Sequence, residues 1–498
     1  MAKIAVIGAG FSGLSAAAYV AAAGHEVHVF EKNSLPGGRA RQMKTKEGYL
    51  FDMGPSWYWM PDIFENFFSD FGYSVRDFYK LSLLDPAFEI VFEHDQSILI
   101  PSSFEGLCAL FESIEPGSAS MLKKFMKEAE NKYNIAMNKL VYRPGLSWTE
   151  FINRDSIGMA MRSHIFQSFG TYVRKFFSDP RLIALMEFPV LFLGAMPDEI
   201  PALYSLMNYA GLKLGTWYPD GGFGKIIESI VKIASVHGAS FHYNAPVKNL
   251  LIKNQQVIGL VVKDEELFFD AVIATADYSF VEKELIPAQY SNYKEEYWEK
   301  KTFAPSCLIY FVGLSRKLES IQHHSLFFED CSPDHALDIY KNKRWPAKPQ
   351  FYVCCPSKTD RNVAPQGHEN LFFLMPVAPG LEDPETVREK YFDIMIDRLE
   401  KHLGQEIRQY IDFKKSYCVS DFVEDYHAYK GNAYGLSNTL KQTAIFKPKV
   451  RNKKLSNLFY AGQLTVPGPG VPPSLISGKI ASGELLKMIK RKEYEAAI

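Results

Sequence analysis

The stretch Ile4-Ala5-Val6-Ile7-Gly8-Ala9-Gly10-Phe11-Ser12-Gly13 decides the fold of this 498-residue chain. Its β-branched run predicts a buried parallel strand, and the alanine-rich residues 14–23 predict the helix that follows. Gly8 permits the tight turn between them, Gly10 lets the backbone approach a pyrophosphate, and Gly13 lets helix and strand pack closely. The helix N-terminus then faces the anion. The chain is therefore predicted to bind a dinucleotide.

A second predicted strand, residues 26–30, supports this interpretation because it ends in Glu31. A carboxylate about 20 residues after such glycines can accept hydrogen bonds from ribose hydroxyls, and it repels a 2′-phosphate. The alternative is a glycine-rich turn followed by an ordinary surface glutamate. The ordered series of strand, turn, helix, strand and acid argues against that alternative.

Two further segments near the N-terminus carry related chemistry. Gly37 and Gly38 let another backbone segment reach a pyrophosphate, and the forked guanidinium of Arg39 can neutralise it. The pair Gly54-Pro55 alone predicts only a turn.

The C-terminal region repeats the pattern of strand, turn and helix. Residues 458–461 form an apolar run into Gly462, a Pro/Gly-rich segment spans 465–474, and residues 475–489 predict a helix. Taken alone, the segment is equally typical of a surface loop before a terminal helix.

Composition excludes several classes of protein. Hydrophobic residues make up 47% of the chain, enough for two domains, and 56 basic residues balance 57 acidic ones, which gives no reason to expect a nucleic-acid partner. The six cysteines show no paired metal spacing, so we expect reduced thiols, no metal and a cytoplasmic protein. No run reaches 18 apolar residues, and the first strand and glycine motif occupy the region of a signal peptide.

The motifs together resemble a known superfamily of flavoproteins. Residues 31–40 resemble the segment that lies against the flavin nucleotide in the amine oxidase and phytoene desaturase superfamily, and 54–57 match its Gly-Pro pair beside the isoalloxazine. Residues 458–489 resemble its closing motif, in which a helix N-terminus covers the flavin pyrimidine and stabilises negative charge there.

In detail, the chain is similar to bacterial carotenoid desaturases of the phytoene desaturase type. This likeness is carried by residues 51–62, 187–194 and 431–436 and by the closing motif. Two departures stand out: Lys447 replaces an arginine of many relatives, and residues 462–465 lack the usual small residues before threonine.

The resemblance implies FAD as cofactor and a set of residues that hold it. Val247 belongs to this set because the family contacts adenine through the backbone at that position. The implied FAD-binding residues are Gly8, Gly10, Phe11, Ser12, Gly13, Glu31, Lys32, Gly38, Arg39, Gly54, Pro55, Ser56, Trp57, Val247, Gly462, Gln463, Gly470, Val471 and Pro472.

The implied fold is α/β, with a discontinuous Rossmann-like FAD-binding domain interleaved with a mixed α+β substrate-binding domain. The FAD-binding domain is expected over residues 1–95, 217–283 and 425–498, because Gly221-Gly222, a helix over 225–237 and a strand over 240–243 repeat the nucleotide-binding pattern. The substrate-binding domain is expected over 96–216 and 284–424.

Residues 151–215 are rich in aromatic residues and methionine. They predict either the core of a helical layer or the lining of a site for a long apolar ligand. An apolar helix near residues 158–177 is also typical of a segment lying on a membrane surface. The resemblance to carotenoid desaturases implies a carotenoid substrate, which suits such a lining, and we expect peripheral association with the inner face of the cell membrane. The electron acceptor is not identified.

The implied activity is FAD-dependent phytoene desaturation towards lycopene by stepwise dehydrogenation. A hydride would leave an allylic carbon for the flavin, and a neighbouring carbon would lose a proton. The alternatives are a hydroxycarotenoid 3,4-desaturase, a redox-neutral carotenoid isomerase, an amine oxidase, which the aromatic middle region argues against, and a non-catalytic prenyl-binding module.

The sequence identifies no general base. His427 and Tyr434 lie near the predicted return to the flavin, and Arg143 lies in an apolar stretch. A structural role is the simpler interpretation of His427, and a surface ion pair that of Arg143. We expect no single side chain to be indispensable for proton removal.

Overall fold

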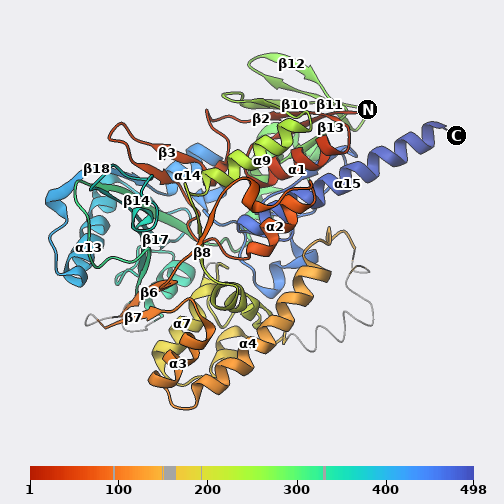
Figure 1. Ribbon diagram of the computed structural model, residues 1–498. Helices are drawn as coiled ribbons and strands as arrows, with labels where there is room; N and C mark the ends of the chain where they lie inside the picture. Colours follow the sequence, from red (N-terminus) through yellow and green to blue (C-terminus); the bar gives the residue numbers. More distant parts are fainter. Residues whose placement is uncertain (93–95, 148–149, 151–163, 192, 329–332, 498) are drawn as a thin grey trace.

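A five-stranded parallel sheet forms the centre of one half of the protein (Figure 1). Its order is β19-β13-β1-β2-β9, with β1 (Lys3–Ile7), β2 (Glu26–Phe30), β9 (Ser240–His242), β13 (Ala271–Ala274) and β19 (Leu458–Tyr460). Every neighbouring pair is parallel. The computed structural model describes residues 1–92, 96–147, 150, 164–191, 193–328 and 333–497.

Three helices cover one face of this sheet: α1 (Phe11–Ala22), α9 (Gly224–Val236) and α15 (Val471–Ala497). Helix α1 lies between the other two, and its alanines are buried because small side chains let neighbouring helices approach closely. The opposite face packs on the antiparallel sheet β10 (Val247–Lys253), β11 (Gln256–Val262) and β12 (Glu265–Phe268).

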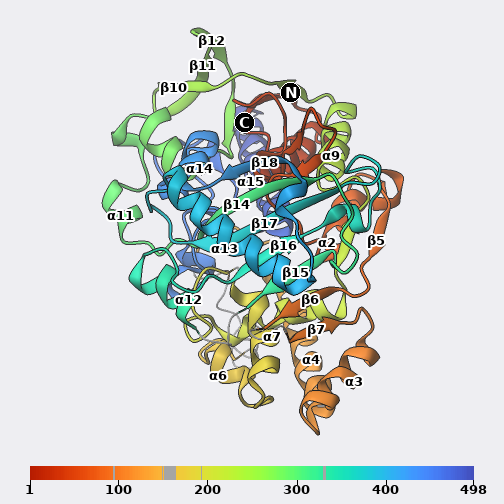
Figure 2. The same ribbon diagram turned by 90° about the vertical axis from the view of Figure 1, so that its left-hand side faces the viewer.

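A second, seven-stranded sheet forms the other half, in the order β18-β14-β17-β16-β15-β6-β7 (Figure 2). Its pairs are antiparallel except for β15 with β6. Helix α13 (Glu385–Leu403) crosses one face and packs its apolar side on β14 and β17. The strands are β6 (Phe88–Val91), β7 (Ser97–Ile100), β14 (Ser306–Leu314), β15 (His324–Phe327), β16 (Phe351–Cys354), β17 (Glu369–Val377) and β18 (Ile411–Tyr417).

A helical layer lies below both sheets in Figure 1 and contains α3 (Phe104–Ile114), α4 (Ser118–Ile135), α6 (Phe169–Val173) and α7 (Pro180–Leu191). The remaining strands and α-helices of the described residues are β3 (Gln42–Lys44), β4 (Leu50–Asp52), α2 (Pro61–Ser69), β5 (Leu81–Leu83), α8 (Leu206–Asn208), β8 (Trp217–Pro219), α10 (Tyr278–Phe280), α11 (Glu295–Glu299), α12 (Asp334–Leu337) and α14 (Val419–Tyr426).

Most described aromatic residues of 164–215 belong to the core of this layer. Phe169, Tyr172, Phe177 and Phe188 are buried against other side chains. For these residues, the prediction that the aromatic stretch forms the core of a helical layer is therefore correct. Part of the predicted apolar helix, residues 158–163, lies outside the described residues.

The predicted fold class is confirmed: a Rossmann-like parallel sheet is interleaved with a mixed sheet and a helical layer. Some predicted bounds differ. The first helix begins at Phe11 rather than residue 14, and the last spans 471–497 rather than 475–489. The domain boundaries stay a prediction.

Candidate functional site

One cavity of about 770 Å³ contains almost every residue assigned to FAD binding. Eighteen of the nineteen line it, although they come from chain segments around residues 8–57, 247 and 462–472. Gly13 is the exception. The cavity extends from the carboxyl ends of the parallel strands into the helical layer.

The glycine turn leaves the N-terminus of α1 open to the cavity. No side chain caps this helix at Gly10, so its first N–H groups are available to an anion. Gly8 has a φ of 101°, and a Cβ on Gly13 would lie 2.0 Å from the carbonyl oxygen of Gly8. Gly13 therefore serves the packing of helix on strand, and Gly8 and Gly10 shape the turn.

Glu31 is buried, and its carboxylate is hydrogen-bonded to the glycine turn after β1. One oxygen accepts a hydrogen bond from the Ala9 N–H at 2.8 Å, and the other accepts from the backbone and side-chain nitrogens of Asn33 at 2.9 and 3.0 Å. A carboxylate has about four acceptor sites. One site therefore remains for a hydroxyl in the cavity.

Arg39 provides a partly buried positive charge. Its guanidinium lies over the Tyr426 ring, 4.9 Å from the centroid, and donates to the Asn432 carbonyl at 3.2 Å. Its Nε is buried with no hydrogen-bond partner among the described residues. Burial lowers the Arg39 pKa and raises that of cavity-lining Asp277 to about 6. An unsatisfied guanidinium beside an open helix N-terminus fits a pyrophosphate.

Helix α14 and the residues after it form a wall of the cavity, in which sequence reasoning singled out His427 but not Asp425. Asp425 accepts from Arg41 Nη2 at 2.5 Å and from the Tyr417 hydroxyl at 2.8 Å. His427 stacks on Phe280 with centroids 3.9 Å apart. No local motif marks these residues, because long-range packing brings them to the cavity. Asp277 could have been found, since it closely follows parallel strand β13.

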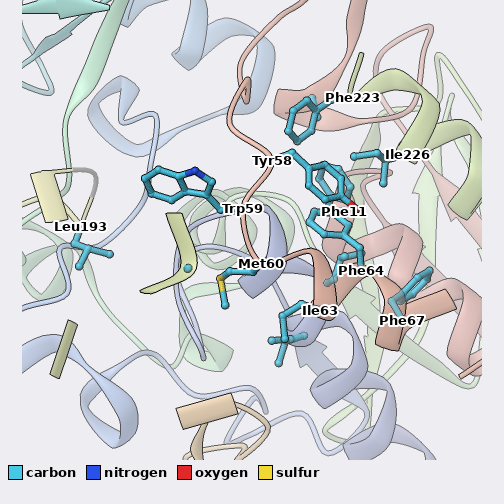
Figure 3. Close-up of a cluster of buried hydrophobic side chains, with 14 of the residues drawn as sticks. Phe11, Tyr58, Trp59, Met60, Ile63, Phe64, Phe67, Leu193, Phe223 and Ile226 are labelled. Atoms are coloured by element: carbon cyan, nitrogen blue, oxygen red, sulfur yellow. The ribbon is translucent and has the colours of Figure 1, made fainter. Parts of the chain in front are cut away.

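The other end of the cavity is apolar. Figure 3 shows Trp59, Met60 and Leu193 on the opposite side of the buried cluster from Tyr58, Phe64 and Phe223. Among the described residues that line this end, Arg143 alone carries a charge. They are Trp59, Met60, Ala136, Met137, Leu140, Val141, Arg143, Ile165, Leu193, Pro201, Leu203, Tyr204, Leu206, Met207, Leu440, Thr443 and Ala444.

The three candidates for proton transfer all line the cavity. Burial and the nearby Lys32 charge lower the His427 pKa. The Tyr434 hydroxyl lies 3.8 Å from Cys307 Sγ, and burial raises the pKa of both groups, that of Cys307 to about 12. Arg143 is half-buried. No carboxylate or imidazole lines the apolar end in the part of the chain that the structure describes.

Fold and site together define a dinucleotide-binding flavoprotein. A family model described as flavin containing amine oxidoreductase matches residues 11–486. The chain belongs to this family.

Comparisons with individual proteins agree with this assignment. A carotenoid 3,4-desaturase of Haloarcula japonica is 37% identical over 487 residues, 98% of each chain. A zeta-carotene-forming phytoene desaturase of Myxococcus xanthus is 30% identical over 494 residues, which cover 97% of this chain and 94% of that one. A putrescine oxidase double mutant shares the fold, with a TM-score of 0.63 at 13% identity over 98% of this chain and 99% of that one.

The cofactor is FAD. The open helix N-terminus, the remaining acceptor site of Glu31 and the unsatisfied Arg39 Nε fit its pyrophosphate and ribose.

Proposed function

We propose that this chain is an FAD-dependent carotenoid desaturase. The observation that carries the proposal is the continuity of the cavity, which runs from the glycine turn to an apolar end. A hydrocarbon offers no charge or hydrogen-bonding group, so its recognition depends on shape and apolar contact. The named activities of both carotenoid relatives support the same substrate class.

We propose that the assigned residues bind FAD, which supplies a hydride acceptor when bound. The glycine turn and Arg39 hold the pyrophosphate, and Glu31 holds a ribose hydroxyl. Trp59, Met60 and Leu193 exclude water and position the polyene. The described residues at the apolar end include no carboxylate or imidazole. Loss of a proton from the substrate therefore depends on how the cavity positions the polyene and on delocalisation of positive charge along it.

We propose phytoene as the first candidate substrate, converted towards lycopene by stepwise dehydrogenation. The Myxococcus relative and the apolar character of the cavity support this choice. An amine substrate is disfavoured, because the described residues of the apolar end offer no carboxylate to hold an ammonium group.

A second candidate is 3,4-desaturation of a hydroxylated carotenoid. The Haloarcula relative favours it, and so does a polar pair beside the cavity. Asn438 Oδ1 and Lys447 Nζ are buried without hydrogen-bond partners among the described residues, and each would lie 3.2 Å from a Cβ on Gly468. A hydroxyl can donate to the first and accept from the second.

Expression in a phytoene-accumulating bacterium with pigment analysis tests the proposal. We expect coloured, lycopene-like products; unchanged phytoene would contradict the first candidate. In parallel, purified holoenzyme is given a hydroxylated carotenoid under anaerobic conditions. Bleaching of the flavin with 3,4-desaturated product supports the second candidate. An isomerised product with oxidised flavin would indicate an isomerase, and purified protein that never retains FAD would indicate a binding module.

We propose that the protein takes its substrate from a membrane surface. Leu440 lines the cavity and is 40% exposed, and Tyr142 and Phe166, which directly follow cavity residues, are 37% and 83% exposed. Large exposed apolar side chains are suited to contact with lipid. Among the described residues, no helix is long and apolar enough to cross a bilayer.

A further inference from the structure

A buried group of metal-ligating side chains lies outside the cavity lining. His324 begins β15 and pairs directly with Cys354, which ends β16, and His323 precedes His324. Their exposed fractions are 5% for His323, 0% for His324 and 1% for Cys354. One ligand atom from each lies within 4.8 Å of the others.

The hydrogen bonds of the two imidazoles leave one nitrogen of each ring unused. His323 Nδ1 lies 2.7 Å from Thr359 Oγ1, and His324 Nδ1 lies 2.6 Å from the Tyr352 hydroxyl. Both Nε2 atoms are buried with no partner among the described residues. An unsatisfied buried polar group costs about 1–3 kcal/mol, so a ligand that takes both nitrogens would stabilise the fold.

The hydrogen-bond directions determine the tautomer of His324. The Tyr352 hydroxyl donates its proton to Ser56 Oγ at 3.0 Å, so it accepts from His324 Nδ1–H. A neutral ring protonated on Nδ1 has a free lone pair on Nε2.

We propose that His323 Nε2, His324 Nε2 and Cys354 Sγ bind a Zn²⁺ ion. Two imidazoles and a thiolate suit this ion, and metal-binding histidines characteristically hydrogen-bond through the other ring nitrogen. The thiol proton leaves for water as the zinc–sulfur bond forms. The Tyr218 ring lies 4.8 Å from that of His323, and its hydroxyl is buried without a partner among the described residues.

The site is structural rather than catalytic, because its ligands are closed off from solvent. Trp57 stacks on the His324 ring with centroids 4.1 Å apart, and Tyr352 holds Ser56. The ion would therefore fix the wall behind residues 56–57, which line the cavity. Sequence analysis predicted no metal, because two adjacent histidines and a distant cysteine form no recognisable spacing.

The test measures metal in the full-length holoenzyme after equilibration with Zn²⁺ and removal of free ion, by elemental analysis. We expect about one zinc per chain. Replacement by Co²⁺ should give the near-ultraviolet absorption of a cobalt–thiolate bond. Cys354→Ser should abolish this absorption and weaken zinc binding at least tenfold. Cys355→Ser is the matched control, because it removes a neighbouring buried thiol outside the site.

Protein that binds no zinc, or equal zinc and cobalt signals in the two cysteine variants, would overturn the proposal. If Cys354→Ser does not fold, zinc X-ray absorption on the unmodified protein provides the second measurement. A shell of two nitrogens and one sulfur supports the site, and a shell without sulfur contradicts it.

Discussion

At Gly13, main-chain atoms already occupy the position that a side chain would take. The Gly8 carbonyl oxygen lies 2.0 Å from the place of a Cβ, and backbone atoms cannot move aside as a flexible side chain can. Gly483 in α15 is the opposite case, since nothing lies within 4 Å of its Cβ position. Gly13 is therefore required by packing, whereas a side chain at Gly483 would meet no steric obstacle.

We expect Gly13→Ala to destabilise the protein by about 3 kcal/mol through overpacking and to release FAD. Gly483→Ala should stabilise it by up to about 1 kcal/mol, because alanine favours helix. Denaturant unfolding and the flavin content of purified protein check both expectations. Normal FAD content and stability in Gly13→Ala would contradict the packing role.

Lys447 predicts a pH dependence of stability in the FAD-free protein. Burial lowers its pKa to about 7, whereas an unfolded lysine titrates near about 10.4. The folded state therefore binds fewer protons between these values, and stability falls as pH falls from about 10 to 7. Each pKa unit corresponds to about 1.4 kcal/mol.

Lys447→Met should remove this slope and exceed the unmodified protein in stability at pH 7 by a few kcal/mol. Chemical unfolding at several pH values between 7 and 10 measures it. Lys441→Met, which removes an exposed lysine six residues earlier, is the control. Parallel pH profiles for unmodified protein and Lys447→Met would refute the expectation.

At the scale of elements, α14 connects the second sheet to the FAD end of the cavity. The Asp425 carboxylate accepts hydrogen bonds from Arg41 and from the hydroxyl of Tyr417, which ends β18. The ring of the following Tyr426 lies against the guanidinium groups of Arg39 and Arg41. Asp425 therefore ties this wall to both Arg41 and β18.

We expect Asp425→Ala to weaken FAD binding about tenfold, because breaking this partly buried pair costs roughly 1–2 kcal/mol after solvent screening. Quenching of FAD fluorescence during titration of FAD-free protein measures the affinity. Glu424→Ala removes the same charge from an exposed neighbour and should leave affinity unchanged. Equal affinities of the two variants would exclude a specific role for Asp425.

Sequence analysis predicted the elements that short local motifs mark, and it missed those that reach the cavity only through packing between residues far apart in the chain. The strand, glycine turn and acid around residues 4–31 obey short-range rules, and the structure brings Glu31 and Arg39 to one cavity. The walls formed by α14 and by residues 136–143 have no such signature, because only tertiary packing brings them there. The last helix begins at Val471 because prolines fit the first turn of a helix.

At the scale of the whole molecule, the proposed contact with a membrane rests on the apolar end of the cavity and on exposed apolar residues next to it in the chain. Phe166 and Leu440 contribute apolar surface there. Burying a side chain of this size contributes about 1.5–3 kcal/mol.

Replacing both Phe166 and Leu440 by serine should therefore reduce binding to phosphatidylcholine–phosphatidylglycerol vesicles more than tenfold. Flotation of holoenzyme with these vesicles provides the measurement. Val236→Ser changes an equally apolar residue, 64% exposed at the end of α9, and serves as control. Unchanged flotation of the double variant would contradict a membrane contact at these residues.

The parallel sheet has a consequence for biosynthesis. Its central strand β1 leaves the ribosome before its edge strand β19 and the turn at 462–470, which follow more than 450 residues later. At a synthesis rate of about 5–20 residues per second, the glycine turn waits tens of seconds for its last partners. Cofactor capture must therefore be a late event, and the edge of β13 that pairs with β19 stays uncovered until then.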